Sequence, residues 1–302
     1  MTKGFEVAAS IFLTGANGFV GRRLLPLLAA CPNRRVVCLV RSTPAQSVPE
    51  NVEFVVGDLV DSPAYADALA TCDAVIHLAA ATGKRAPAEY FRINRDGSQT
   101  LVTEAERAGA RRFVHVSTIA VNFPDKSHYP YAQSKEEAEA AVRQSSLDWT
   151  IVRPTMILGT NAPALEGLSR LAALPLVPMF GDGSNPVQPI LAEDLAAFLL
   201  ATLEDKSLIG RTLEVGGPQV LSIENLLLRI RCAIGKGSAR VVHLPAWPLA
   251  ACLAWVEPWL RPLLPLTAGQ LASFTNPGSI TPDAWVEARQ TGMKNVEEML
   301  AY

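Results

Sequence analysis

Residues 11–21, IFLTGANGFVG, constrain the fold of this chain more than any other stretch. The apolar run at their start predicts a buried strand and the segment after them predicts a helix, so the glycines occupy a strand–helix turn. Gly15 would let the backbone turn out of the strand, Gly18 would leave room for a pyrophosphate, and Gly21 would let the helix lie close to the sheet. The helix start would offer free N–H groups and a positive dipole to phosphates. The same spacing also fits a plain turn without a ligand, so the rest of the chain must decide. Four leucines are expected on the inner face of the helix: Leu24, Leu25, Leu27 and Leu28.

Length and charge narrow the classes of protein that fit. A chain of 302 residues can form one large domain or a core with a smaller lobe. With a net charge of −2, it lacks the basic field that recruits nucleic acid. The cysteines are far apart and the histidines show no ligand spacing, so we expect no disulfide framework, no metal site and a cytoplasmic location. The cysteines are Cys31, Cys38, Cys72, Cys232 and Cys252. We expect His77 and His115 to be buried structural residues of strands.

Strand and helix signals alternate through the first half of the chain, which predicts an α/β fold with a doubly wound parallel sheet. After the first strand, we expect strands at 35–41, 52–57, 74–79, 113–117 and 149–153, and helices at 19–30, 64–70, 88–108 and 131–145. Crossovers of this kind place the carboxyl ends of all strands at one edge of the sheet, where ligands bind.

The pattern loosens after residue 155, which predicts a smaller lobe interleaved with the core. Residues 1–155 are expected to form the nucleotide-binding core, with 187–220 returning to it, and residues 156–186 and 221–302 to form a substrate lobe. In this half we expect helices at 162–174 and 193–203, strands at 177–180 and 211–215, and a helix capped by Ser222 that runs to residue 234.

Residues 246–266 are rich in Leu, Ala and Trp and have about the length of a membrane span. Their four prolines, with Glu257 and Arg261, favour instead a buried or pocket-lining pair of helices that could close over a substrate. Peripheral membrane contact is the alternative. The first six residues lack the basic-then-apolar order of a signal peptide, in keeping with a cytoplasmic location.

The strongest candidate for catalysis is the pair Tyr131 and Lys135. Residues four apart on a helix share a face, so we expect the phenol and the ammonium to meet. A free phenol has a pKa of roughly 10, and a nearby ammonium, together with the positive ring of an oxidised nicotinamide, would lower it toward the range of a general acid or base. Such pairs also occur on ordinary surface helices. The hydroxyls of Ser117 and Thr118, at the end of the fifth strand, are expected at the same edge of the sheet.

The glycine turn, the strand-end hydroxyls and Tyr-x-x-x-Lys together resemble the extended short-chain dehydrogenase/reductase superfamily over nearly the whole chain. That resemblance implies a Rossmann-type NAD(P)-binding fold. It makes Tyr131 the acid/base, Lys135 the group that tunes it and holds the nicotinamide ribose, and Thr118 the hydrogen-bond partner of the reacting oxygen, with Ser117 in reserve. Residues 187–196 and 214–218 are most similar to the group that contains the nucleotide-binding accessory subunit of respiratory complex I and its bacterial relatives.

The resemblance also implies a set of cofactor contacts. Asp58 would accept a hydrogen bond from the adenine amine, although it also fits a solvated turn, and Asn94 would serve helix geometry rather than chemistry. The cofactor-binding residues implied are Gly15, Asn17, Gly18, Phe19, Val20, Gly21, Arg41, Ser42, Asp58, Leu59, Leu78, Ala79, Ala80, Tyr131, Lys135, Pro154 and Thr155.

Arg41, at the end of the second strand, bears on the choice of cofactor. An acidic residue there would bind the ribose hydroxyls of NAD, whereas an arginine accommodates the 2′-phosphate of NADP. A charged hydrogen bond contributes about 1.5–3 kcal/mol, or roughly a tenfold to hundredfold preference. We therefore expect NADP, with NAD as the second choice. A surface arginine without a ligand is the alternative.

These observations predict an NADP-preferring oxidoreductase that acts on a carbonyl or hydroxyl group of a largely apolar small molecule. The position near Val187, where sugar-nucleotide members of the family carry an arginine, offers no cation, although Arg170 or Arg211 could reach in. Two alternatives stay open: a nucleotide-sugar epimerase or dehydratase, and a structural or redox-sensing subunit that binds NADP(H) without turnover. The oligomeric state is open. The expected pocket walls are Phe123, Met156, Ile157, Leu165, Met179 and Phe180, and the alternative is that these side chains fill the core of the smaller lobe.

Overall fold

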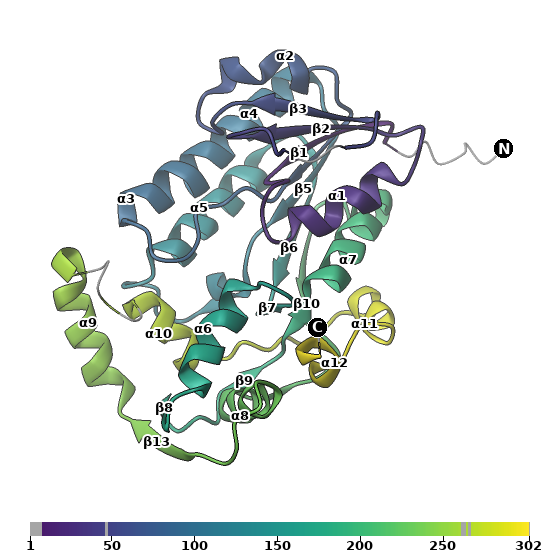
Figure 1. The fold of residues 1–302 in the computed structure, drawn as a ribbon. Helices are drawn as coiled ribbons and strands as arrows, with labels where there is room; N and C mark the ends of the chain where they lie inside the picture. The colour runs from purple at the N-terminus through teal and green to yellow at the C-terminus, as the bar shows by residue number, and fades with distance from the viewer. Residues whose placement is uncertain (1–7, 46–47, 261–263, 265–266, 302) are drawn as a thin grey trace.

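Seven parallel strands form the central sheet of the computed structural model, which describes residues 8–45, 48–260, 264 and 267–301 (Figure 1). Their order is β11-β6-β5-β4-β1-β2-β3, which confirms the predicted doubly wound sheet. Because β1 lies between β2 and β4, the winding direction reverses there, and ligands of such sheets bind at that point. The strands are β1 Ser10–Thr14, β2 Arg35–Val40, β3 Val52–Val56, β4 Ala74–His77, β5 Arg112–Val116, β6 Asp148–Pro154 and β11 Arg211–Val215.

Both faces of the sheet are buried under helices, which is why the central strands β1 and β2 are almost entirely apolar. In β1, Ile11 and Leu13 pack into one core cluster, and Phe12 packs into the cluster on the opposite face. One face is covered by α1 Gly21–Ala29 and α7 Ala192–Glu204, and the other by α2 Ala66–Leu69, α4 Gly97–Ala108 and α5 Pro130–Gln144. In α1 the prediction for Leu27 is wrong, because only Leu24 and Leu28, four residues apart, are fully buried against the sheet.

The helix predicted at 88–108 is interrupted. It consists of α3 Pro87–Tyr90, a π-helical segment Phe91–Asp96 and α4. Asn94 is buried in the π-helical segment, where its Oδ1 accepts a hydrogen bond from the Ala81 N–H at 2.7 Å and its Nδ2 donates to Ser134 Oγ at 3.0 Å. Asn94 therefore ties the loop after β4 to helix α5, in addition to shaping its own helix.

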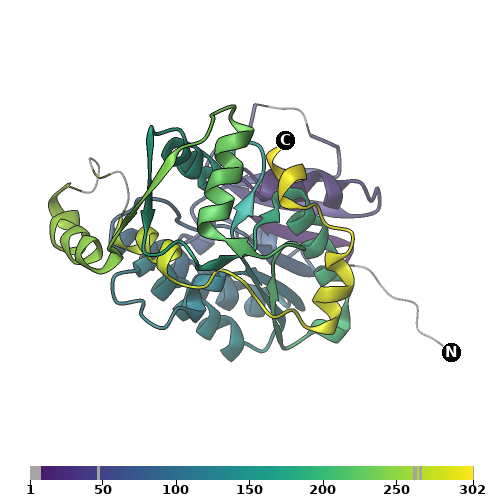
Figure 2. The same cartoon turned by 90° about the horizontal axis from the view of Figure 1, so that it is seen from below.

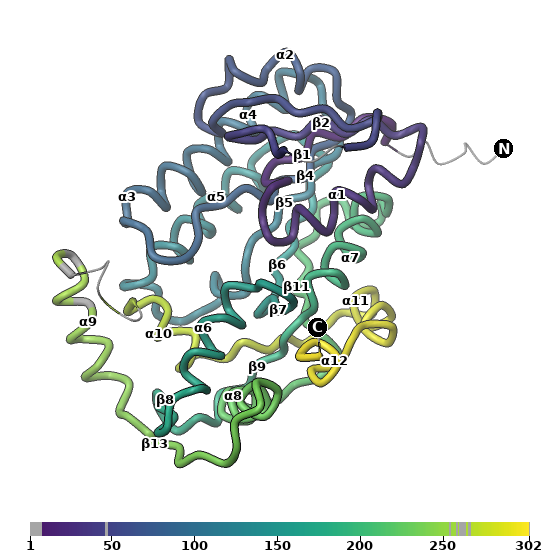
Figure 3. Tube along the Cα trace, viewed as in Figure 1, coloured from purple at the N-terminus to yellow at the C-terminus, as the bar shows by residue number. Residues whose placement is uncertain are grey.

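The second half of the chain returns to the sheet and then leaves it again (Figure 3). Strand β6 leads directly into β7, and the chain later rejoins the sheet through α7 and β11, which pairs with β6. Ser222 caps α8 as predicted, its Oγ accepting from the Asn225 N–H at 3.1 Å. The remaining elements are β7 Ile157–Leu158, α6 Pro163–Ala172, β8 Leu176–Phe180, β9 Pro186–Val187, β10 Ile190–Leu191, β12 Leu221–Ser222, α8 Ile223–Ala233, β13 Arg240–Leu244, α9 Ala246–Leu260, α10 Ala268–Thr275, α11 Ala284–Gln290 and α12 Val296–Leu300.

Most of these later elements gather beyond the end of β6 and enclose a second hydrophobic core (Figures 1 and 2). That core joins α6, β8, α8 and α10 through residues such as Leu168, Met179, Leu226 and Leu271. Val286 of α11 packs instead into the core of the main sheet. The domain division predicted from the sequence stays a prediction. Part of the 246–266 stretch, including Arg261, lies outside the described residues.

Candidate functional site

A groove of about 330 Å³ follows the carboxyl edge of the sheet at the point where the winding reverses. Its floor is the glycine turn. Gly15 has φ +76°, and a Cβ there would lie 2.7 Å from the Ala79 nitrogen. A Cβ on Gly21 would lie 2.1 Å from the Gly15 carbonyl oxygen, so this turn excludes side chains at both positions. The predicted residues that line the groove are Gly15, Asn17, Gly18, Arg41, Ser42, Asp58, Leu59, Leu78, Ala79 and Ala80.

The other residues in the predicted cofactor set lie outside the lining of this groove. Thr155 is buried and its hydroxyl donates to the Gln188 carbonyl, while its N–H donates to Val215 at 2.9 Å. Tyr131 lines the neighbouring cavity. The set outside the groove lining is Phe19, Val20, Gly21, Tyr131, Lys135, Pro154 and Thr155.

Arg41 and Arg92 line the groove near Ser42 and Asp58. Arg41 is exposed beside Ser42, whose carbonyl accepts a hydrogen bond from Asn17 Nδ2 at 3.1 Å. Arg92 also lines the groove, and its guanidinium is 3.4 Å from Asp58 Oδ2. Sequence reasoning missed Arg92, because the residue is identified as a groove residue only once the π-helical segment is seen to lie beside the groove.

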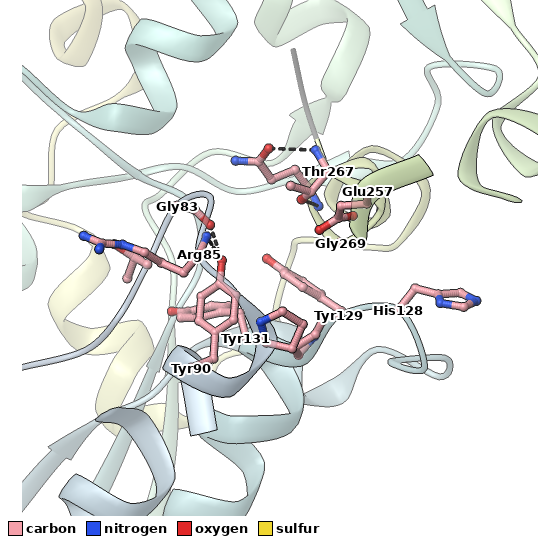
Figure 4. A pocket seen from close by; sticks show the side chains of 13 residues that line it. Gly83, Arg85, Tyr90, His128, Tyr129, Tyr131, Glu257, Thr267 and Gly269 are labelled. Atoms are coloured by element: carbon pink, nitrogen blue, oxygen red, sulfur yellow. Dashed lines mark hydrogen bonds between the residues drawn. The ribbon is translucent and has the colours of Figure 1, made fainter. Parts of the chain in front are cut away.

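A second cavity, of about 220 Å³, adjoins the groove (Figure 4). Arg85 lines both cavities. The ring centroids of Tyr90 and Tyr129 are 6.0 Å and 5.8 Å from that of Tyr131, so three phenols form one side of the cavity. The lining residues are Thr82, Gly83, Arg85, Pro87, Tyr90, His128, Tyr129, Pro130, Tyr131, Glu257, Thr267, Gly269 and Gln270. Of these, sequence reasoning identified Tyr131 as a site residue and placed Glu257 in a pocket-lining stretch.

Thr118 and Ser117 face different partners. Thr118 precedes a 3₁₀ turn, Ile119–Asn122, and its Oγ1 accepts from the Ala120 N–H at 3.3 Å. Burial raises the pKa of Tyr131, and a hydrogen bond to the Thr118 side chain acts in the opposite direction. The Ser117 side chain lies instead against Glu139, whose pKa it helps to lower. Of the two hydroxyls, that of Thr118 is therefore the one that acts on the phenol.

Lys135 is buried beneath the cavity, on the side of the sheet. Its Nζ donates to the Val116 carbonyl at 2.7 Å and lies 3.2 Å from His115 Nε2. Burial lowers the pKa of Lys135 to about 8, although Glu139 acts to raise it. The part of the prediction in which the ammonium lowers the pKa of Tyr131 is wrong, because burial raises the pKa of that phenol and Lys135 contacts strand β5 instead. The effect of a nicotinamide ring on this pKa stays a prediction.

Two buried polar networks hold these elements in place. His77 Nδ1 lies 2.7 Å from Thr14 Oγ1 and its Nε2 2.9 Å from Ser98 Oγ, and burial lowers the pKa of His77 to about 3, which keeps the ring neutral. His77 and His115 are thus buried strand residues, as predicted. Behind α5, Glu139 accepts two hydrogen bonds from Arg153, at 2.9 and 2.7 Å, which fixes the helix to β6.

The predicted apolar pocket walls are wrong. Met156, Leu165, Met179 and Phe180 pack in the second hydrophobic core, Ile157 packs against the main core, and Phe123 packs beside Ala132. These side chains fill cores because the lobe needs an interior of its own. The arginines proposed to hold a diphosphate also face elsewhere.

Arg170 has a side chain that is 82% exposed and lies 3.7 Å from Glu166. Arg211 pairs with Asp283 at 2.7 Å, and it begins β11, at the edge of the sheet opposite the groove. Val187 is buried.

Comparison with known proteins bears on this arrangement. A family model described as NAD(P)H-binding matches residues 15–206. The chain is 38% identical over 195 residues to the ceramide reductase of Caulobacter vibrioides, and the match covers 63% of this chain but only 60% of that protein. It is 26% identical over 294 residues to the mitochondrial NADH dehydrogenase [ubiquinone] 1 alpha subcomplex subunit 9 of Arabidopsis thaliana, covering 93% of this chain and 71% of that one. The solved UDP-glucuronic acid 4-epimerase of Bacillus cereus, in complex with UDP-glucuronic acid and NAD, shares the fold with a TM-score of 0.70 at 20% identity over 96% of each chain.

Proposed function

This chain belongs to the NAD(P)H-binding family, within the extended short-chain dehydrogenase/reductase superfamily, and from that premise we propose that it reduces a carbonyl group of a largely apolar small molecule with NADPH. The observation that carries the proposal is the place of Tyr131. Its phenol, partnered by Thr118, lines a small cavity that adjoins the nucleotide groove at Arg85. A proton donor and a dinucleotide site therefore meet at one point.

The groove fits a dinucleotide on the geometry of its glycines. A side chain at Gly15 would collide with the backbone of Leu78 and Ala79, and one at Gly21 with the backbone of the turn itself. The compact turn so formed places Gly15 and Gly18 in the groove lining, where a pyrophosphate would bind. We place Arg41 and Arg92 at the adenosine end, where their charges favour the 2′-phosphate of NADP over the ribose hydroxyls of NAD. NAD is the second choice.

The reduction needs a hydride on the carbonyl carbon and a proton on the oxygen. The bound NADPH would supply the hydride. Tyr131 would donate its phenolic proton to the oxygen as negative charge develops there, and Thr118 would hold that oxygen by a hydrogen bond. Lys135 would hold the nicotinamide ribose and help to return a proton to Tyr131. Asn94 positions α5 and the loop at Ala81, which border the two cavities.

Three observations support an apolar substrate. Three tyrosine rings line the cavity, and Arg170 and Arg211 lie away from it. The relative with 38% identity is named for the reduction of ceramide, a lipid. An apolar substrate gains about 25 cal/mol for each Å² that it buries against such rings.

A nucleotide-sugar epimerase is the second candidate, and Arg85 is the observation that favours it. Arg85 lines both cavities, and its guanidinium, paired with Glu89 at 2.8 Å, would have to leave that carboxylate to hold a diphosphate. Calorimetry of the NADP-loaded protein against UDP- and dTDP-sugars and against hydrophobic ketones separates the candidates. We expect binding of the ketones only. Micromolar binding of a nucleotide sugar that is lost in Arg85→Ala, but kept in the exposed control Arg170→Ala, would favour the epimerase.

A non-catalytic NADP(H)-binding subunit is the third candidate. A protein of that kind has no need for a proton donor beside the groove, yet Tyr131, Thr118 and Lys135 are all present. Mass spectrometry of the nucleotide that copurifies with the protein, before and after incubation with a panel of ketones, tests it. Conversion of bound NADPH to NADP⁺ only in the presence of a ketone would exclude a purely structural role.

A further inference from the structure

The outward face of α9 is apolar along its whole described length. Three tryptophans on it are among the most exposed large side chains of the protein: Trp247 at 79%, Trp255 at 72% and Trp259 at 70%. The other exposed side chains described on this helix are Ala251 and Cys252. Surface helices of globular proteins normally carry polar or charged residues on the solvent side. The apolar outward face of α9 therefore indicates a surface that binds an apolar or interfacial partner.

The opposite face of the same helix belongs to the substrate site. Leu253 is buried in the second core, and Glu257 lines the cavity beside Tyr131. A Glu257 carboxylate oxygen accepts a hydrogen bond from the Ala268 N–H at 3.1 Å, where α10 begins. Helix α9 therefore has one side in the cavity wall and the other in solvent, and it lies at the outer margin of the molecule in two perpendicular views (Figures 1 and 2).

The chemistry of the exposed side chains favours a lipid surface as their partner. An indole has a large apolar ring and one N–H donor, a combination that prefers the boundary between hydrocarbon and lipid headgroups. The rings of Trp255 and Trp259 lie 5.9 Å apart in an edge-to-face arrangement, one helical turn from each other, and so present one continuous surface.

The size of the patch argues against a second copy of the chain. Three indoles exposed to this extent offer on the order of 500 Å² in total, whereas a stable protein interface needs roughly 800 Å² on each partner. Shallow insertion into a bilayer needs only the apolar face of one helix. Among the described helices, none is long and apolar enough to cross a membrane.

We propose that α9 docks this protein on the surface of a phospholipid bilayer, with Trp255 and Trp259 inserted at the headgroup level and the substrate cavity next to the membrane. The proposal deepens the proposed function and rests on it, because a largely apolar substrate would partition into the same bilayer. Since the exposed face of α9 carries no charged side chain among its described residues, docking depends on apolar contact and persists at high salt.

Flotation of the full-length protein with vesicles of phosphatidylethanolamine and phosphatidylglycerol tests the docking surface. We expect the wild-type protein to float with the vesicles, at low and at high salt. The double variant W255S/W259S should lose affinity at least tenfold, because removing two large apolar side chains from the interface costs well over the roughly 1.4 kcal/mol that a tenfold change represents. The matched control V220S/I209S, at exposed apolar positions away from α9, should float like the wild type.

Any of three results would overturn the docking proposal. The first is a wild-type protein that stays in the soluble fraction, and the second is a W255S/W259S variant that floats as well as the wild type. The third is a wild-type dimer in light scattering that becomes a monomer in W255S/W259S, which would assign the face to a second copy.

Oxidation of NADPH with the panel of hydrophobic ketones, each below its solubility limit and measured without vesicles, tests the proposed function separately. Turnover without flotation would contradict only the docking proposal. Flotation without turnover would contradict only the proposed reductase activity.

Discussion

Tyr131 is the residue on which the proposed chemistry depends. Burial raises the pKa of this phenol, so it carries its proton at neutral pH. The protonated phenol is the form that a general acid in carbonyl reduction requires. The sequence identified the residue through its spacing to Lys135, but the pKa follows from the packing of Tyr90 and Tyr129 around it.

Replacing Tyr131 with Phe removes the donor without changing the shape of the cavity. We expect kcat for ketone reduction to fall by about a hundredfold or more, because general acid catalysis typically contributes that much. The Kd for NADPH should change less than about twofold. The matched variant Tyr129→Phe, which keeps the donor, should lose far less activity. If the Tyr131→Phe enzyme keeps most of the wild-type rate, Tyr131 is not the proton donor.

Lys135 makes the activity dependent on pH. Its pKa of about 8 in the folded protein means that the ammonium loses its proton as the pH rises through that value. Because the charged form is lost at higher pH, kcat/KM and NADPH affinity should fall above about pH 8. In Lys135→Met both should be low and show no step there, whereas the exposed control Lys206→Met should keep the wild-type profile. A wild-type profile that is flat between pH 7 and 9.5 would contradict this role.

Arg41 governs the choice of nucleotide at the other end of the groove. A charged hydrogen bond to the 2′-phosphate contributes about 1.5–3 kcal/mol, so NADPH should bind roughly tenfold to a hundredfold more tightly than NADH. Arg41→Asp should remove or reverse that preference, while Arg240→Asp, an exposed arginine far along the chain, should leave it unchanged. Fluorescence titration measures both constants. Equal binding of NADH and NADPH by the wild type would contradict the assignment of Arg41 to the 2′-phosphate.

At the scale of elements, the glycine turn between β1 and α1 is so tightly packed that position 21 has no room for a side chain. A Cβ on Gly21 would meet the Gly15 carbonyl oxygen at 2.1 Å, so Gly21→Ala must displace backbone. We expect a loss of about 1–3 kcal/mol in the free energy of unfolding, and at least a tenfold weaker Kd for NADPH.

Gly167 of α6 is the matched control for this substitution, because no described atom lies within 4 Å of an added Cβ. Gly167→Ala should stabilise the fold by up to about 1 kcal/mol through helix propensity, without affecting NADPH binding. Chemical denaturation and fluorescence titration together give both values. Unchanged NADPH binding in Gly21→Ala would show that the turn tolerates a side chain.

The sequence predicted elements well where one physical signal dominated. Strands such as β1 and β2 are buried on both faces, so their apolar runs are unbroken after the first residue and place them within a residue or two. The π-helical segment at Phe91–Asp96 gave no such signal, because its turn is stabilised by contacts of Asn94 with Ala81 and Ser134, which are distant in sequence. The same limit explains why Arg92 was missed.

At the scale of the whole molecule, the nucleotide groove could be predicted and the substrate cavity could not. The groove is built from strand ends, whose position follows from the parallel sheet. The cavity combines Arg85 from a loop, Tyr129 from the start of α5 and Glu257 from α9, and no local pattern links these residues. The apolar side chains expected to line it fill the core of the lobe instead, because any lobe must first bury its own interior.

The central claim is that this protein transfers a hydride from NADPH to an apolar carbonyl compound. Single-turnover mixing of the protein with NADPH that carries deuterium at the transferable position of the nicotinamide, followed by mass spectrometry of the product, tests it most directly. With a hydrophobic ketone, we predict an alcohol that carries the deuterium on the former carbonyl carbon, formed by the wild type and not by Tyr131→Phe. Deuterium that stays on the nucleotide, or that appears in an epimerised nucleotide sugar and in none of the ketones, would contradict the claim.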